Sequence, residues 1–245
     1  MIPLSFLWIA LDIFCVIHAM RNGADRMWIY VIVLLPGVGS IAYLIAEALP
    51  QMYGTKARKL AGSAIRTIDP ERNLRRLEAD LALVDSAENK RRVAEEQMKL
   101  GRYREAMELI ESALVGIHAD DPSLLLALAR AAEGSADYAR ALDALDHLRA
   151  AHPDFQSGEA HLIYARSLQG LGRDEEAMRE LASLVTYATG EEARCRYAML
   201  LRRHGREAEA QIVFKEILLR AKRANRRYRS TEREWIDTAR REAVT

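Results

Sequence analysis

The residue types that carry out catalysis or bind metals are present in this sequence, but they are not spaced for either task. The histidines fall in separate segments, and there is no zinc-type Cys/His spacing, no HExxH motif and no Gly-rich phosphate loop. We therefore predict no catalytic residue, no metal and no cofactor. We expect a packing or solvated role for each of the six histidines, which are His18, His118, His147, His152, His161 and His204.

Charged residues are segregated along the chain, although the net charge is only +1. Residues 1–103 have 3 more basic than acidic side chains, residues 104–193 have 10 more acidic ones, and residues 194–245 have 8 more basic ones. The electrostatic potential of such an uneven charge distribution influences which partners a protein binds and how fast it encounters them. The basic stretch 220–229 either binds nucleic acid or anionic lipid, or is a solvated helix end. We favour the helix end, so nucleic acid is not a predicted partner.

Two arginines occupy equivalent places in the sequence and have chemistry suited to binding. Arg130 directly follows Ala129, and Arg166 directly follows Ala165. A guanidinium can pair with both oxygens of a carboxylate, so a recurring arginine could bind a peptide carboxylate or an acidic segment. The alternative is that both arginines are ordinary solvated residues.

The elements that must position these arginines are four copies of one segment. Each copy contains a motif of the type Leu-Gly-Arg-Tyr-Arg-Glu-Ala (100–106), and the final alanines are separated by 35, 36 and 33 residues. A second alanine lies 12 residues before each of them. Small residues at these positions allow two antiparallel helices to pack closely, and Gly suits the tight turn between them. The paired alanines are Ala94 and Ala106, Ala129 and Ala141, Ala165 and Ala177, and Ala198 and Ala210.

This pattern resembles the tetratricopeptide repeat (TPR), whose period is about 34 residues. The aromatic residue after the turn is present as Tyr103 and Tyr138 but is replaced by Asp174 and Glu207, so copies three and four are degenerate. The resemblance implies a concave groove lined by the first helix of each pair. The copies cover about 87–120, 122–155, 158–190 and 191–225. The predicted groove residues are Arg91, Glu95, Arg130, Glu133, Arg166, Gln169, Cys195, Met199 and Arg202.

Helices are also expected at both ends of the array, because a solenoid needs caps. Asp69-Pro70 is an N-cap followed by Pro at the first helical position, which predicts a helix over 70–84. Thr231 and Glu234 predict a capping box for a last helix over 231–243. The solenoid is therefore predicted over 69–245.

The N-terminal part of the chain contains two apolar runs, at residues 2–20 and 27–49, joined by a short polar loop. Each run is near the length of about 20 residues that crosses a bilayer. Nothing basic precedes Arg21, which argues against a cleaved signal peptide. We therefore predict a two-helix transmembrane hairpin over 1–49.

A basic juxtamembrane linker is predicted over 50–68. Its positive charges outnumber the two of the inter-helix loop, so the positive-inside rule favours a cytoplasmic C-terminal domain. The same residues could contact anionic lipid headgroups. They are Lys56, Arg58, Lys59 and Arg66.

The second apolar run contains Pro36, Gly39 and Tyr43, and this spacing resembles the N-terminal membrane segment of bacterial phospholipase D-type cardiolipin synthases. The resemblance covers about residues 4–48 and implies a bacterial inner-membrane anchor. It does not imply their chemistry, because those enzymes need a His-x-Lys pair and no His here is followed two residues later by Lys. Asp12, in the first run, is either a functional intramembrane carboxylate or one that is hydrogen-bonded to the second helix.

The predicted fold is all-α: a two-helix transmembrane hairpin followed by an α-solenoid of TPR-like helix pairs with terminal capping helices. The predicted function is that of a non-enzymatic scaffold, anchored as a multi-pass protein in the bacterial inner membrane, which binds an unidentified protein partner through its groove. The alternative is an accessory factor in envelope phospholipid metabolism that binds lipid headgroups or a lipid enzyme.

Overall fold

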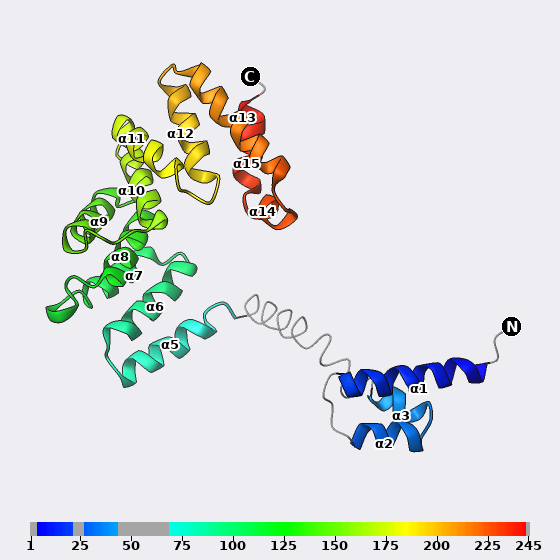
Figure 1. Cartoon of the computed structure of the whole chain (residues 1–245). Helices are drawn as coiled ribbons and strands as arrows, with labels where there is room; N and C mark the ends of the chain where they lie inside the picture. The colour runs from blue at the N-terminus through cyan, green and yellow to red at the C-terminus, as the bar shows by residue number, and fades with distance from the viewer. Residues whose placement is uncertain (1–3, 22–26, 44–68, 244–245) are drawn as a thin grey trace. The chain divides into compact units, whose positions relative to one another are not determined.

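The computed structural model describes residues 4–21, 27–43 and 69–243, and every regular element in these ranges is a helix (Figure 1). The chain divides into two compact units, Met1–Arg72 and Asn73–Thr245. We refer to them as unit 1 and unit 2.

Unit 2 is built from four consecutive antiparallel helix pairs, so the predicted array of TPR-like pairs is confirmed. A single helix, α5 (Arg72–Leu83), precedes the pairs. Two helices follow them, α14 (Arg226–Thr231) and α15 (Arg233–Glu242). The pairs are α6 (Ala87–Lys99) with α7 (Tyr103–Glu111), α8 (Pro122–Gly134) with α9 (Tyr138–Ala151), α10 (Gly158–Gly170) with α11 (Asp174–Val185), and α12 (Glu192–Arg203) with α13 (Glu207–Arg223). A short 3₁₀ turn, Gly116–His118, lies between α7 and α8.

The eight alanines that define the repeat are fully buried, since all of them have 0% exposed surface. The apolar residues four and seven positions after the second alanine of each pair are also buried, from Ile110 in α7 to Ile217 in α13. Burial of this periodic face supplies the main stabilisation, at about 25 cal/mol per Å² of apolar surface.

The turn inside each pair needs a left-handed backbone conformation. Gly101, Gly172 and Gly205 have φ of 77°, 72° and 76°, and Ala136 takes the same place in the second pair with φ of 62°. A side chain in this region clashes with its own backbone at a cost of about 1–2 kcal/mol. Ala136 is therefore a strained residue that the rest of the second pair holds in place.

The aromatic residue after the turn packs against the next helix pair. A Cβ added to Gly134 would lie 2.4 Å from the ring of Tyr103, and one added to Gly170 would lie 2.4 Å from the ring of Tyr138. Each tyrosine thus requires a glycine five residues after the first alanine of the following pair.

The third pair makes the same inter-repeat contact with different chemistry. Asp174 occupies the position that corresponds to Tyr103 and Tyr138, and Arg203 occupies the one that corresponds to Gly134 and Gly170. The Arg203 guanidinium forms an ion pair with the Asp174 carboxylate at 3.0 Å. Burial alone would raise the pKa of Asp174, but hydrogen bonds from Arg203 and His204 lower it below its ordinary value of 3.8. In the third pair both residues of the contact therefore differ from those of the first two pairs. The apparent degeneracy at Asp174 is the replacement of a Tyr–Gly packing contact by an ion pair.

The array curves with the first helices on the inside. The first helix α8 contacts both α6 and α10, whereas the second helices α7, α9 and α11 are not in comparable contact with one another. From the first to the third pair, neighbouring pairs are therefore closer on the side of the first helices. The side chains that α6, α8, α10 and α12 present on this side form what we call the first-helix face.

The C-terminal end differs from its prediction. Thr231 is the last residue of α14, and the N-cap of α15 is Glu232, whose side chain makes no cap hydrogen bond. The Glu232 carboxylate instead accepts a hydrogen bond from the backbone N–H of Glu191 at 2.9 Å. The predicted capping box of Thr231 and Glu234 is therefore wrong, because Thr231 lies inside α14 and is not the N-cap of a helix.

The described part of unit 1 contains α1 (Leu4–Arg21), α2 (Met27–Leu34) and α3 (Val38–Tyr43). Its small core is made by Cys15 and Ala19 of α1, Ile32 of α2 and Tyr43 of α3.

The predicted membrane-spanning pair is not formed by the described residues of unit 1, 4–21 and 27–43. The second apolar run is broken at Pro36 into helices of 8 and 6 residues, and Gly37 there has φ of 81°. Helix α1 has 18 residues and contains Asp12, His18 and Arg21. It is about 27 Å long at about 1.5 Å per residue, against a hydrocarbon core of about 30 Å. Within the described ranges no helix has the length and apolar character to cross a membrane. The predicted multi-pass location in the inner membrane is therefore wrong.

Candidate partner-binding face

The predicted groove residues all lie on first helices, at repeated distances from the buried alanine. Arg91 and Cys195 lie three residues before it, and Glu95, Arg130, Arg166 and Met199 one residue after it. Glu133, Gln169 and Arg202 lie four residues after it. The spacing places these residues on the first-helix face. The structure also joins some of them by ion pairs between consecutive first helices, which the spacing alone does not predict.

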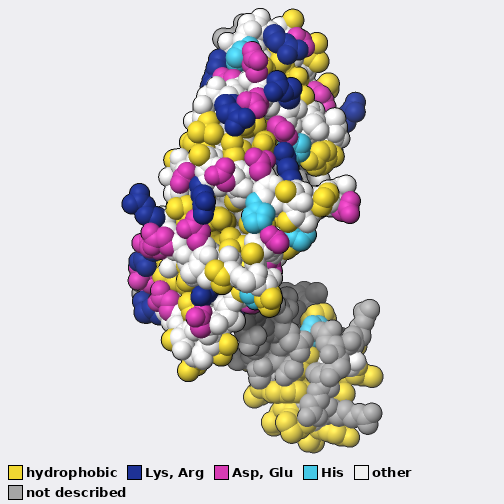
Figure 2. Space-filling model, turned by 90° about the vertical axis from the view of Figure 1, so that its left-hand side faces the viewer, with side chains coloured by type: hydrophobic (Ala, Val, Ile, Leu, Met, Phe, Trp, Pro, Cys, Tyr) yellow, Lys and Arg dark blue, Asp and Glu magenta, His cyan; other side chains and the backbone are white. Residues whose placement is uncertain are grey.

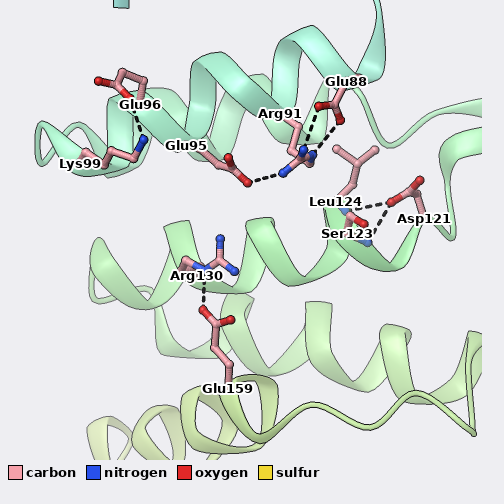
Figure 3. Close-up of polar contacts among 10 residues, drawn as sticks. All are labelled: Glu88, Arg91, Glu95, Glu96, Lys99, Asp121, Ser123, Leu124, Arg130 and Glu159. Carbon is pink, nitrogen blue, oxygen red and sulfur yellow. Dashed lines mark hydrogen bonds and ion pairs between the residues drawn. The ribbon is translucent and has the colours of Figure 1, made fainter. Parts of the chain in front are cut away.

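The two recurring arginines link consecutive helices through glutamates. In Figure 3, Arg130 of α8 donates from Nε to Glu159 of α10 at 2.8 Å. Arg166 of α10 lies between Glu133 of α8, at 2.6 Å, and Glu192 of α12, at 3.1 Å. The face is therefore a ladder of ion pairs that runs from α8 to α12.

Sequence reasoning missed Glu159 and Glu192, although a signal for them exists. Both lie six residues before the buried alanine of their helix, and Glu88 holds the same place in α6. Ser123 occupies it in α8, so the ladder has no such step between α6 and α8. In α6, Arg91 instead pairs within its own helix, with Glu88 at 2.8 Å and with Glu95 (Figure 3).

Arg166 and Arg130 differ in how much of their binding capacity the chain uses. Burial alone would lower the pKa of Arg166, but Glu133 and Glu192 on its two sides raise it above the ordinary arginine value. Arg130 has 35% of its side-chain surface exposed. Its terminal nitrogens point away from Glu159 in Figure 3. Of the two recurring arginines, Arg130 thus pairs with one described carboxylate and Arg166 with two.

The last repeat of the face is covered by α15. Cys195 has 0% exposed surface and packs in one cluster with Met199, Trp235 and Ile236. Burial raises the pKa of the Cys195 thiol to about 12, so this cysteine is not a reactive group. Two further contacts fix α15 here: the guanidinium of Arg196 lies over the Trp235 ring at 5.2 Å, and Arg202 forms an ion pair with Glu242. Gln169 of α10 lies next to this end and accepts from Arg196 at 3.4 Å.

A buried charge network holds the C-terminal helices to the array. The Glu191 side chain has 0% exposed surface and accepts from Arg220 of α13 at 2.9 Å and from the Tyr228 hydroxyl of α14 at 2.6 Å. Arg194, 5% exposed, donates to the carbonyls of Val185, Ala188 and Gly190 and lies 3.5 Å from Glu191. Through Glu191 the loop before α12 is joined to α13, α14 and the start of α15.

The residues of the predicted membrane motif meet in unit 1. Asp12 of α1 accepts hydrogen bonds from the backbone N–H of Gly37, at 2.9 Å, and from the Ser40 hydroxyl, at 2.6 Å. A Cβ on Gly39 would lie 2.4 Å from the Val31 carbonyl, so α3 approaches α2 closely there. The Tyr43 hydroxyl lies 2.9 Å from His18 Nδ1. Pro36 stands at the break between α2 and α3, and Lys56, Arg58, Lys59 and Arg66 lie outside the described residues.

The described surface of unit 1 is mostly hydrophobic, whereas the surface of unit 2 carries interspersed charges of both signs (Figure 2). Large apolar side chains of α1 and α2 are more than half exposed, among them Phe14, Met20, Tyr30 and Leu34. Among the described residues, no group of three or more His, Cys, Asp or Glu side chains could hold a metal ion.

Comparison with protein-family models and with curated proteins finds no match. Solved structures do match, and several of them are described as TPR or TPR-like proteins. A thermophilic TPR protein of Thermus thermophilus is 18% identical, with a TM-score of 0.53 over 70% of this chain and 89% of its own. A double mutant of MamA RS-1 is 17% identical, with a TM-score of 0.54 over 64% and 88%. A Podosopora anserina protein with nearly identical TPR-like repeats is 19% identical, with a TM-score of 0.52 over 69% and 93%. At these identities the likeness shows the fold, and the fold of unit 2 is that of TPR proteins.

Proposed function

We propose that this chain is a non-enzymatic scaffold that binds a segment of a partner protein on the first-helix face of α6, α8 and α10. The observation that carries the proposal is the state of Arg130. It is anchored by one carboxylate, partly exposed, and turned with its terminal nitrogens toward the space beside α6. The last repeat offers no equivalent place, because α15 covers it.

The ion-pair ladder supports the same proposal by making the face rigid. Arg130 is held by Glu159, and Arg166 is held from both sides, so the side chains lose little conformational freedom when a partner arrives. Preorganisation of this kind lowers the entropic cost of binding. The ladder also selects the ligand: a carboxylate beside Arg130 forms a charge-assisted pair, whereas a cation there meets an arginine.

The alternative role in envelope phospholipid metabolism has less support. It was predicted from a membrane-spanning hairpin, which the described helices do not form, and from Lys56, Arg58, Lys59 and Arg66, which lie outside the described residues. The scaffold proposal rests on residues whose contacts are described.

A charge reversal on the first-helix face tests the proposal, and the chain offers a matched control. Arg130→Glu removes the proposed contact and its link to Glu159. Arg140→Glu removes a similar inter-repeat link, because Arg140 of α9 pairs with Glu111 at 2.6 Å away from the first-helix face. Full-length proteins would be crosslinked in native cells and the captured partners quantified. We expect a partner set that is lost with Arg130→Glu and kept with Arg140→Glu. Equal capture by both variants would overturn the proposal.

A further inference from the structure

A second surface with the features of a binding site lies at the C-terminal end of unit 2, away from the residues of the first-helix face discussed above. The helices α13, α14 and α15 enclose a cleft of about 490 Å³. Its floor is apolar and includes Leu218, Ala221 and Ile236, the last two only 6% and 5% exposed. Its remaining lining residues are Lys222, Arg229, Arg233, Asp237 and Arg240.

The cleft carries an excess of positive charge that the chain does not neutralise. Its only lining carboxylate is Asp237, which lies 2.5 Å from Arg240 and 3.6 Å from Arg233. Lys222 and Arg229 are exposed, and among the described residues neither is in an ion pair. Four cations therefore face one carboxylate, in the part of the chain where basic residues exceed acidic ones by 8. An occupant of opposite charge would reduce their mutual repulsion.

The walls of the cleft are fixed by the buried network around Glu191. Arg220 of α13 and Tyr228 of α14 both bind the Glu191 carboxylate, and Glu232, which precedes α15, binds its backbone N–H. The three helices that line the cleft thus share one anchor. The cleft exists before any ligand arrives, which lowers the cost of binding.

We infer that this cleft binds a short acidic segment of a partner protein, with carboxylates at Lys222 and Arg229 and an apolar side chain on the floor at Leu218 and Ile236. The apolar floor distinguishes this ligand from a nucleic acid. Bases stack on aromatic rings, and no aromatic residue is among those that line the cleft. A phosphate backbone would use the basic rim and leave the floor uncovered.

The test uses the full chain and a short fluorescein-labelled peptide made only of Glu and Leu, with Leu at helical spacing. Its affinity is measured by fluorescence anisotropy. The cleft variant combines Lys222→Glu with Arg229→Glu. The matched control combines Arg223→Glu with Arg227→Glu, which changes the net charge equally on the same two helices outside the cleft lining. All four side chains are exposed, and circular dichroism verifies that both variants fold.

We expect the cleft variant to weaken peptide binding by about tenfold or more, and the control to weaken it by about twofold, since Arg223 and Arg227 lie outside the cleft lining and act only through solvent-screened charge. A peptide with Ser in place of Leu should lose most of its affinity, because it cannot use the floor. Equal weakening by both variants, or full affinity of the Ser peptide, would overturn the inference. The inference would also be overturned if the full chain preferred another ligand to the peptide and lost that ligand in the cleft variant. The ligands to be compared are phosphatidylglycerol vesicles, a single-stranded oligonucleotide and, in sedimentation, a second copy of the chain. None of these outcomes depends on Arg130, so the scaffold proposal is tested separately.

Discussion

Replacement of Glu191 by alanine should destabilise unit 2 more than any exposed charge substitution. The Glu191 carboxylate is fully buried, and its removal leaves the 5%-exposed Arg194 guanidinium with only the more distant Glu216 carboxylate, at 3.9 Å. It also leaves the Tyr228 hydroxyl without its acceptor at 2.6 Å. Loss of one partner from a buried ion pair costs about 3–5 kcal/mol. The Arg220 side chain is 40% exposed and can be rehydrated, so we discount its share and expect about 3 kcal/mol.

Urea denaturation followed by circular dichroism measures this loss. With a denaturant slope of about 2 kcal/mol per molar urea, the midpoint should fall by about 1.5 M. Glu209→Ala is the control, because Glu209 pairs with Arg206 at 2.6 Å on the same helix pair but on the exposed surface. That change should leave the midpoint nearly unaltered. Hydrogen exchange of the Glu191→Ala protein should rise first in α14 and α15. Equal midpoints for the two variants would refute the assignment of Glu191 as the anchor of the C-terminal helices.

Three further changes test the repeat contacts. Ala136→Gly should raise the free energy of unfolding by about 0.5–1 kcal/mol in a urea titration, since it relieves a left-handed alanine, whereas Ala139→Gly inside α9 should lower it by about 1 kcal/mol. Gly134→Ala should destabilise the protein because its Cβ would meet the Tyr103 ring at 2.4 Å, and in a Tyr103→Ala background the same change should stabilise it; the same sign in both backgrounds would contradict the packing. The pKa of Asp174 is lowered in the folded state, so its ionised carboxylate stabilises the fold above about pH 3.8. This stabilisation is lost as the pH falls through the lower pKa of the folded state. Urea midpoints measured across that range should fall more steeply for the wild type than for Asp174→Asn.

The repeat architecture of unit 2 could be predicted from sequence because it depends on short-range spacing. The paired alanines mark where two helices must approach, and every one of them is fully buried. The same spacing placed Arg130 and Arg166 on one face. It did not predict their partners, because Glu159 and Glu192 become neighbours only when consecutive pairs stack. The covering of Cys195 by Trp235 was missed for the same reason, since residues far apart in sequence meet there.

The errors have local physical causes. Hydropathy treats residues 27–49 as one apolar run, but Pro36 interrupts backbone hydrogen bonding and Gly37 allows the turn, so two short helices form in place of one span. The Thr231 capping box failed because the chain is already helical at Thr231, the last residue of α14, and α15 begins only after Glu232.

Photo-crosslinking from the first-helix face tests the central claim most directly. A photoreactive residue at Ser123, which is exposed on α8 six residues before the buried alanine, would be compared with one at Ala150, exposed on the second helix α9. Crosslinked peptides from native cells would be identified by mass spectrometry. The account predicts that the residue at position 123 captures an acidic segment of a partner protein, that the one at position 150 does not, and that Arg130→Glu abolishes the product. Capture from position 150 alone, or a product from position 123 that survives Arg130→Glu, would contradict it.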